Sequence, residues 1–158
     1  MLEKYHCKVG LKSPAHITMI PPFWMQPEKE QQLITDIDAI SSSAQPFTID
    51  IKNFSAFKPR TIYVDVIVNE ELRSLKAVID KFFSLADYKM KFEARPFHPH
   101  VTIATRDLHK KDFHEAWAFF ETKKFKANWQ AKGLSVLRHN TKNWEVTYSS
   151  AFRMMDVL

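Results

Sequence analysis

Glycine is almost absent from this chain. The sequence of 158 residues contains two glycines, Gly10 and Gly133. Loops that cradle a phosphate with backbone amides need several glycines at fixed spacing, so neither a dinucleotide-binding fingerprint nor a P-loop can be written from this pair. A phosphate ligand must therefore be held by side chains or by isolated backbone amides.

Cysteine and long apolar runs are also scarce. Cys7 is the single cysteine, which excludes an internal disulfide and a cysteine-rich metal knuckle and fits a reducing compartment. No apolar run approaches the length of a membrane span, and the first residues lack the apolar core of a signal peptide. We therefore expect a soluble, cytoplasmic protein with no membrane partner.

The chain does have a large apolar and aromatic content and a modest basic excess. Hydrophobic residues make up 45% of the sequence, including 13 Phe and 4 Trp, which is ample for a packed core. The length fits one compact domain, which can contain two lobes. The formal net charge of +5 favours an anionic ligand and is compatible with nucleic acid.

A short pattern occurs twice. Residues 13–20 read Ser-Pro-Ala-His-Ile-Thr-Met-Ile, and residues 97–104 read Phe-His-Pro-His-Val-Thr-Ile-Ala. Alternate side chains of a β-strand share a face, so we expect two strands, each with a histidine and a threonine on one face and apolar residues on the other. The duplication suggests two half-domains that together place two imidazoles across one cleft. Histidine titrates near neutral pH, which suits general acid–base catalysis.

The order of the predicted elements indicates an α+β fold. Helices are predicted at about 27–43, 70–86 and 110–122, strands at 15–20, 46–52, 61–68, 97–105, 124–131, 134–139 and 144–150, and a loop at 87–96. Short turns between strands favour antiparallel pairing with helices packed outside. A His-x-Thr strand, a helix and paired strands recur at 15–68 and 97–150. We therefore expect residues 1–158 to form a single domain of two pseudo-symmetric lobes around a central cleft.

These motifs resemble those of the two-histidine phosphoesterase superfamily, and within it the bacterial RNA 2′-5′ ligase-like and cyclic phosphodiesterase branch. Both copies satisfy the family pattern of His, apolar residue, Thr or Ser, apolar residue (the HxT motif), and the similarity extends from about residue 8 to the C-terminus. The resemblance implies a bilobal fold in which His16 and His100 act on a phosphodiester. It also implies that Thr18 and Thr102 bind the non-bridging oxygens, with no metal and no other cofactor.

The start of the chain departs from the family pattern. Family members usually place a strand and a helix before the first motif, whereas only 15 residues precede His16. A missing strand would leave a sheet edge exposed. We expect either an in-frame extension upstream or a homodimer that pairs this edge.

The first hypothesis for function is a metal-independent phosphoesterase that opens a 2′,3′-cyclic phosphate at an RNA end or on a small nucleotide. One imidazole would take a proton from water and the other would protonate the departing ribose oxygen, while the threonine hydroxyls would stabilise the phosphoryl oxygens. The near-identity of the motifs leaves open which histidine is the acid. Two alternatives remain: cleavage or joining of 2′-5′ phosphodiester links in RNA, and a non-catalytic module that binds a nucleotide or RNA.

Other residues are weaker candidates for the site. Arg106 shares the alternation of positions 100, 102 and 104 and could clamp a phosphate; the alternative is a solvated arginine at a strand end. Four further candidates for substrate contacts, each with packing or a supporting role as the alternative, are Tyr63, Phe23, Phe97 and His98. Two ligands without carboxylate or thiolate support do not make a metal site, so the His-Pro-His sequence at 98–100 does not predict one. Lysines at 110–111 and 123–126 are the best candidates for an RNA-backbone patch.

Overall fold

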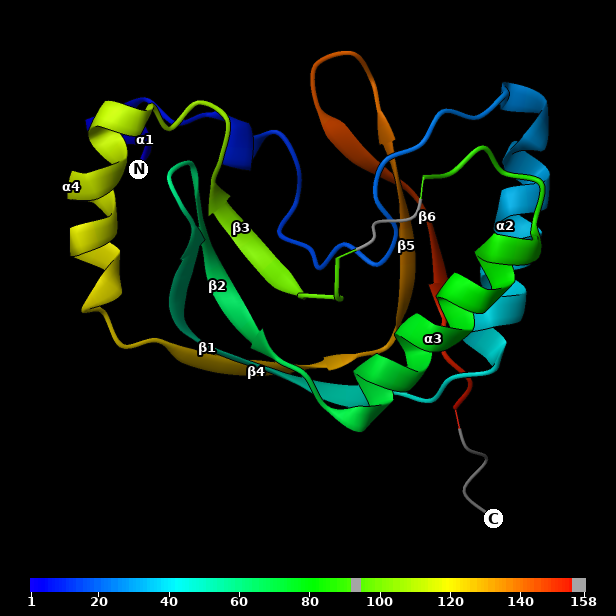
Figure 1. Cartoon of the computed structure of the whole chain (residues 1–158). Helices are drawn as coiled ribbons and strands as arrows, with labels where there is room; N and C mark the ends of the chain where they lie inside the picture. The colour runs from blue at the N-terminus through cyan, green and yellow to red at the C-terminus, as the bar shows by residue number, and fades with distance from the viewer. Residues whose placement is uncertain (92–94, 155–158) are drawn as a thin grey trace.

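The computed structural model describes residues 1–91 and 95–154 and confirms the predicted α+β class (Figure 1). Its helical elements are α1 (Leu2–Tyr5), η1 (Val9–Leu11), η2 (Pro27–Lys29), α2 (Glu30–Ser42), α3 (Glu70–Leu85) and α4 (Lys110–Glu121). Its strands are β1 (Phe47–Phe57), β2 (Thr61–Ile67), β3 (His100–Ala104), β4 (Lys126–Ala131), β5 (Gly133–His139) and β6 (Trp144–Ala151). The predicted loop at 87–96 has no helix or strand in its described part, and its residues 92–94 lie outside the described residues.

The strands form two antiparallel sheets. One has four strands in the order β3-β2-β1-β4, and the other is the β5–β6 hairpin. Strand β3 carries the second motif and pairs with β2, while β4 pairs with β1. Strands from both sequence repeats therefore meet in the same sheet, instead of each repeat building a sheet of its own. Helix α4 lies at one end of the molecule, and α2 and α3 lie at the other (Figure 1).

The long helices form where apolar periodicity predicts them. Helix α3 buries Leu72, Leu75, Ile79 and Phe83, which are spaced three or four residues apart and share one face. Asn69 caps this helix, because its side chain accepts a hydrogen bond from the backbone N–H of Leu72. These apolar side chains join Ile49 and Val64 from the sheet in the main core, so α3 is fixed against β1 and β2.

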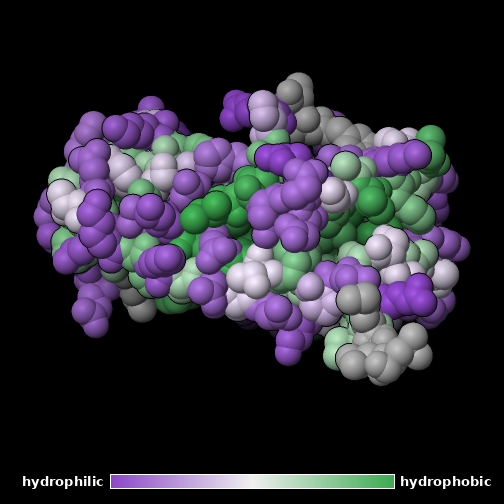
Figure 2. Space-filling view, turned by 90° about the horizontal axis from the view of Figure 1, so that it is seen from below, coloured by the Kyte–Doolittle hydropathy of each residue, from purple (hydrophilic) through white to green (hydrophobic). Residues whose placement is uncertain are grey.

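A second apolar cluster lies under α4. Phe113 and Ala116 of this helix pack with Ile62 of β2, Ala104 of β3 and Cys7 from the start of the chain. Hydrophilic side chains predominate on the surface of that end of the molecule (Figure 2), as expected for a helix with one buried face. Within residues 1–91 and 95–154, no helix is long and apolar enough to cross a membrane.

The first motif is not a β-strand, which corrects the expectation for residues 15–20. No strand is assigned between residues 12 and 26. Proline lacks the backbone N–H that a ladder needs, and Pro14, Pro21 and Pro22 bracket the motif on both sides. The expected alternation of side chains is nevertheless present. Ile17 and Met19 pack against the main core, whereas His16 and Thr18 are exposed.

Candidate active site

The second motif occupies strand β3 at the edge of the four-stranded sheet. In the β2–β3 ladder, His100 lies opposite Asp65 and Thr102 lies opposite Tyr63. Residues directly opposite in an antiparallel pair project from the same face, so these four side chains share one face of the sheet. Val101 belongs to the opposite face and packs against the main core. The predicted segregation of polar and apolar residues is therefore confirmed for this motif.

The first motif presents its polar residues in the same way without a strand. His16 and Thr18 are exposed, while the intervening Ile17 is half-buried against the core. The motif is joined to the rest of the fold through its apolar side chains and not through a sheet ladder. Just before it, the backbone N–H of Trp144 at the start of β6 donates to the carbonyl of Lys12, 2.6 Å away.

Both motif histidines make the same hydrogen bond to the backbone. The Nδ1 of His16 is 2.7 Å from the carbonyl oxygen of Pro14, and the Nδ1 of His100 is 2.7 Å from the carbonyl oxygen of His98. A carbonyl oxygen can only accept, so each Nδ1 must carry the proton. Each imidazole therefore keeps Nε2 available, as a base when neutral and as an acid when protonated.

An aromatic cluster surrounds the ring of His100. The ring centroid of His100 lies 4.9 Å from that of Tyr63 and 5.1 Å from that of Phe57, and the last two rings are 4.5 Å apart. Tyr63 is almost fully buried, whereas Phe57 keeps 44% of its surface exposed. The cluster restricts the movement of the His100 imidazole by packing on its sides.

His98 links this cluster to a carboxylate. Its Nε2 lies 3.2 Å from the hydroxyl of Tyr63 and 3.3 Å from Oδ1 of Asp65. Its backbone carbonyl is the acceptor that holds Nδ1 of His100. His98 thus contacts the motif histidine through its main chain and the adjacent strand through its side chain.

Two predicted aromatic contacts lie in packed surroundings. Phe23 is half-buried against the main core and meets the ring of Tyr88 edge-on at 5.8 Å. Phe97 packs against the same core, with Nζ of Lys76 5.3 Å from its ring centroid. Among the described residues, neither ring is in the aromatic cluster around His100.

Arg106 does not continue the alternation of β3. The β2–β3 register shifts next to Tyr63, and the strand ends at Ala104, which is fully buried in the cluster under α4. Arg106 follows in a turn with a φ of 41° and is exposed. The alternation that singled out Arg106 is therefore interrupted before it, and its contact with phosphate stays a prediction.

The sequence patterns did not predict that Phe57 and Asp65 lie beside the second motif. The signal for Asp65 was its alternation with Tyr63 in the strand at 61–68, which places both on one face. Phe57 gave a weaker signal, because β1 extends to it only through an irregularity at Asn53, where φ is 60°. The predicted strand at 46–52 ended before this point.

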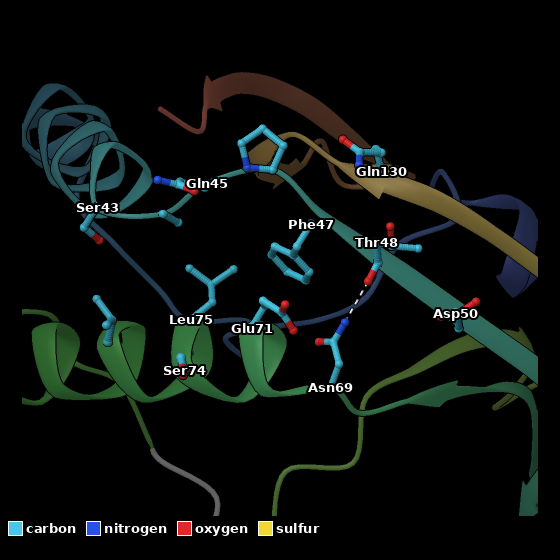
Figure 3. Close-up of a pocket in the computed structure, with 13 residues that line it drawn as sticks. Ser43, Gln45, Phe47, Thr48, Asp50, Asn69, Glu71, Ser74, Leu75 and Gln130 are labelled. Carbon is cyan, nitrogen blue, oxygen red and sulfur yellow. Dashed lines mark hydrogen bonds between the residues drawn. The ribbon is translucent and has the colours of Figure 1, made fainter. Parts of the chain in front are cut away.

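A surface hollow lies away from both motifs. It has a volume of about 550 Å³ and lies between α3 and β1, where Asn69, Glu71, Leu75 and Asp50 line it (Figure 3). The Asn69 amide donates to the carbonyl oxygen of Thr48, which also lines the hollow, at 2.7 Å. None of the motif residues lines this hollow. Within residues 1–91 and 95–154, no group of three or more His, Cys, Asp or Glu side chains is placed to hold a metal ion.

Similarity in sequence connects the chain with curated bacterial proteins. It is 31% identical over 98 residues to a Bacillus pumilus SAFR-032 protein named "Putative phosphoesterase", in a match that covers 59% of this chain and 53% of the relative. An Oceanobacillus iheyensis protein with the same description is 30% identical over 105 residues, with 63% and 56% covered. The chain thus spans about half the length of the curated relatives it matches.

Similarity in fold extends over most of the chain. A crystal structure of a Thermus thermophilus protein matches 90% of this chain and 80% of its own, with a TM-score of 0.63 and 14% identity. A crystal structure of a phosphoesterase matches 89% and 78%, with a TM-score of 0.64 and 16% identity. The family model of the 2′-5′ RNA ligase superfamily matches residues 2–143, which include both motifs. The chain belongs to the 2′-5′ RNA ligase superfamily.

Proposed function

We propose that this protein is a metal-independent phosphoesterase that hydrolyses 2′,3′-cyclic phosphates, carried by an RNA end or a small nucleotide. The observation that carries the proposal is the matched orientation of His16 and His100. Each donates Nδ1–H to the carbonyl two residues before it, at 2.7 Å, and so keeps Nε2 for the substrate. Two imidazoles with free Nε2 atoms are the minimum set for one proton removal and one proton delivery.

The reaction needs one neutral and one protonated imidazole. The neutral one takes a proton from water through Nε2 as the water oxygen attacks phosphorus. The bond from phosphorus to one ribose oxygen breaks, and the protonated imidazole gives its proton to that oxygen. The product is a phosphomonoester next to a free hydroxyl, and the two histidines exchange protonation states. This step requires the two imidazoles to flank the phosphorus from opposite sides.

The threonines of the two motifs supply hydroxyl donors to the phosphoryl oxygens. Thr102 lies two residues after His100 on the same face of β3, and Thr18 has the same relation to His16 among exposed side chains. Charge on the non-bridging oxygens increases on attack, and oriented donors stabilise it. Removing one such donor typically costs about 10²–10³ in kcat.

Cleavage of 2′-5′ phosphodiester links is the second candidate function. The description of the matching family model favours it. It uses the same proton transfers on a linear diester, so the substrate and not the histidine pair separates the two functions.

Phosphorus NMR tests both candidates. The wild-type protein is mixed with adenosine 2′,3′-cyclic phosphate, or with a 2′-5′-linked dinucleotide, in the presence of a chelator. His16→Ala and His100→Ala run in parallel, with His139→Ala as the control because the His139 ring contacts the tilted ring of Trp144 and lies outside both motifs. We expect turnover of the cyclic phosphate that survives chelation and falls by about 10²–10⁴ in both motif variants. Near-normal turnover by His100→Ala, or activity that disappears with chelation, would contradict the proposal.

A further inference from the structure

Phe57 is an exposed aromatic ring that touches the candidate catalytic centre. It ends strand β1 and lies in the aromatic cluster, with ring centroids 5.1 Å from His100 and 5.4 Å from His98. Both imidazoles meet it edge-on, with interplanar angles of 85° and 72°. Tyr63 supports it from within the fold at 4.5 Å. Although it has three ring neighbours, Phe57 leaves 44% of its surface exposed.

The exposed surface of Phe57 suits a planar, apolar group. Aromatic side chains stack on nucleobases without regard to sequence, because every base has a π-face. A base and the cyclic phosphate of the same nucleotide are attached to one ribose, so a subsite for the base must lie beside the group that acts on the phosphate. Phe57 meets this condition through its contact with the His100 ring.

The surroundings of Phe57 favour an anionic ligand. The turn that follows β1 carries Lys58 and Arg60, which are both exposed. Nζ of Lys58 lies 5.8 Å from the ring centroid of Trp117, and positive charge in this turn attracts an anionic nucleotide to this part of the surface. By contrast, the aromatic candidates Phe23 and Phe97 are packed against the main core.

We propose that Phe57 is a nucleobase-stacking platform, which makes the protein bind a base-bearing ligand more tightly than a phosphate on a base-free sugar. This inference rests on the proposed function, because it assigns the base subsite of that same centre. It makes Phe57 a residue that determines specificity through binding and takes no part in proton transfer. Any of the common bases would be accepted, because stacking does not read hydrogen-bonding edges.

The test compares a base-bearing ligand with a base-free one. Wild type and Phe57→Leu are titrated by calorimetry with adenosine 2′-monophosphate and with 1-O-methylribose 2-phosphate. Leucine keeps the apolar contact with Tyr63 but removes the π-face. We expect the wild type to bind the adenosine ligand more tightly, and Phe57→Leu to lose about tenfold in affinity for it. Affinity for the base-free ligand should change by less than about twofold.

Two further variants separate stacking from structure. Phe57→Tyr should retain the preference, because it retains the ring. Phe119→Ala is the matched control, since Phe119 is 57% exposed on α4 and contacts Phe120, not the aromatic cluster. It should bind both ligands like the wild type. Equal wild-type affinity for the two ligands would overturn the inference, and so would an equal loss of both in Phe57→Leu.

Turnover is measured separately with the two corresponding cyclic phosphates. If the wild type prefers the base-bearing ligand in calorimetry and turns over neither cyclic phosphate, the stacking inference holds and the proposed hydrolysis fails. If it turns over both at equal kcat/KM and binds both equally, hydrolysis holds and the stacking inference fails. A lower KM for the adenosine substrate than for the base-free one supports both, provided that this difference is lost in Phe57→Leu and retained in Phe57→Tyr.

Discussion

The Nδ1 atom of His100 is held 2.7 Å from the backbone carbonyl oxygen of His98. The relation recurs in the first motif, where the carbonyl of Pro14 holds His16. In both copies the acceptor lies two residues before the histidine, although one motif is a strand and the other is not. The orientation of each imidazole is thus set locally by its own motif.

A bell-shaped pH dependence of kcat/KM is the first expected outcome. One limb reports the histidine that must be neutral, and the other reports the histidine that must be protonated. His16→Ala and His100→Ala should each remove one limb as well as lower the rate, because each variant has lost one of the two proton-transferring imidazoles. The variant that loses the acidic limb identifies the base. A full bell retained by both variants would rule out the assignment.

Asp65→Asn should slow catalysis without unfolding the protein. Asp65 Oδ1 is 3.3 Å from Nε2 of His98, whose carbonyl orients His100. Asparagine keeps an oxygen acceptor at this position but removes its charge, and weakening the hydrogen bond by about 1 kcal/mol would slow the reaction roughly fivefold if it acts on the orientation of His100. Asp50→Asn is the matched control, since Asp50 lies on β1 opposite Asn128 and lines the separate hollow.

The measurement for these two variants is kcat together with the imidazole NMR signals of His100. A positioning role predicts that kcat falls, KM changes little and the His100 signals shift in Asp65→Asn alone. If kcat falls equally in both variants, or if the His100 signals stay in place, Asp65 does not act through the His98 carbonyl.

Much of the fold follows from periodicity in the sequence, and the site follows only in part. The helices α2, α3 and α4 lie where the apolar spacing predicts them, because each buries one stripe of its own side chains. Strand β2 is similarly predictable from its β-branched run. These elements are predictable because the apolar face that the sequence pattern defines is the face that packs against the core.

The structure differs from the sequence-based expectations where the backbone is not regular helix or strand. The segment around His16 keeps a strand-like alternation but has prolines on both sides and no ladder partner. Strand β1 continues past an irregularity at Asn53 and ends at Phe57. The register shift between β2 and β3 interrupts the alternation of side chains before Arg106. Bulges depend on how two strands pair, so a single strand's sequence does not reveal them.

Gly10→Ala should destabilise the protein and disturb the second motif. A Cβ at Gly10 would lie 2.5 Å from the carbonyl oxygen of Ile103 in β3, so η1 and β3 would have to separate. Overpacking of this kind typically costs about 1–3 kcal/mol. The measurements are urea unfolding and, without urea, kcat at a temperature where the variant remains folded.

Gly133→Ala provides the comparison for that variant. Its added Cβ would meet the carbonyl oxygen of Ser150 at 2.1 Å, within the β5–β6 hairpin. We expect a comparable loss of stability with kcat retained in the folded fraction. If Gly10→Ala keeps normal stability, or loses stability with kcat unchanged, the approach of η1 does not position β3.

The stability of the protein should fall in acid partly through Asp38. This carboxylate on α2 accepts hydrogen bonds from the Ser150 hydroxyl at 2.6 Å and from the Tyr148 hydroxyl at 2.7 Å, and these two bonds lower the pKa of Asp38 below its usual value. A carboxyl whose pKa is lower in the folded state stabilises the fold above its unfolded pKa of about 3.9. That contribution is lost as the pH falls through the folded pKa.

Asp38→Asn tests this linkage through urea unfolding at about pH 7 and about pH 3. Asparagine keeps an oxygen acceptor but does not titrate. The variant should therefore have a lower free energy of unfolding than the wild type at neutral pH. Between neutral pH and pH about 3, its free energy of unfolding should fall by less than that of the wild type. Tyr148→Phe is the partner variant: it removes one donor and should weaken the acid dependence only in part, because Ser150 still favours the charged carboxylate. Parallel pH dependences in wild type and Asp38→Asn would mean that the anchoring of α2 to β6 does not depend on the charge of Asp38.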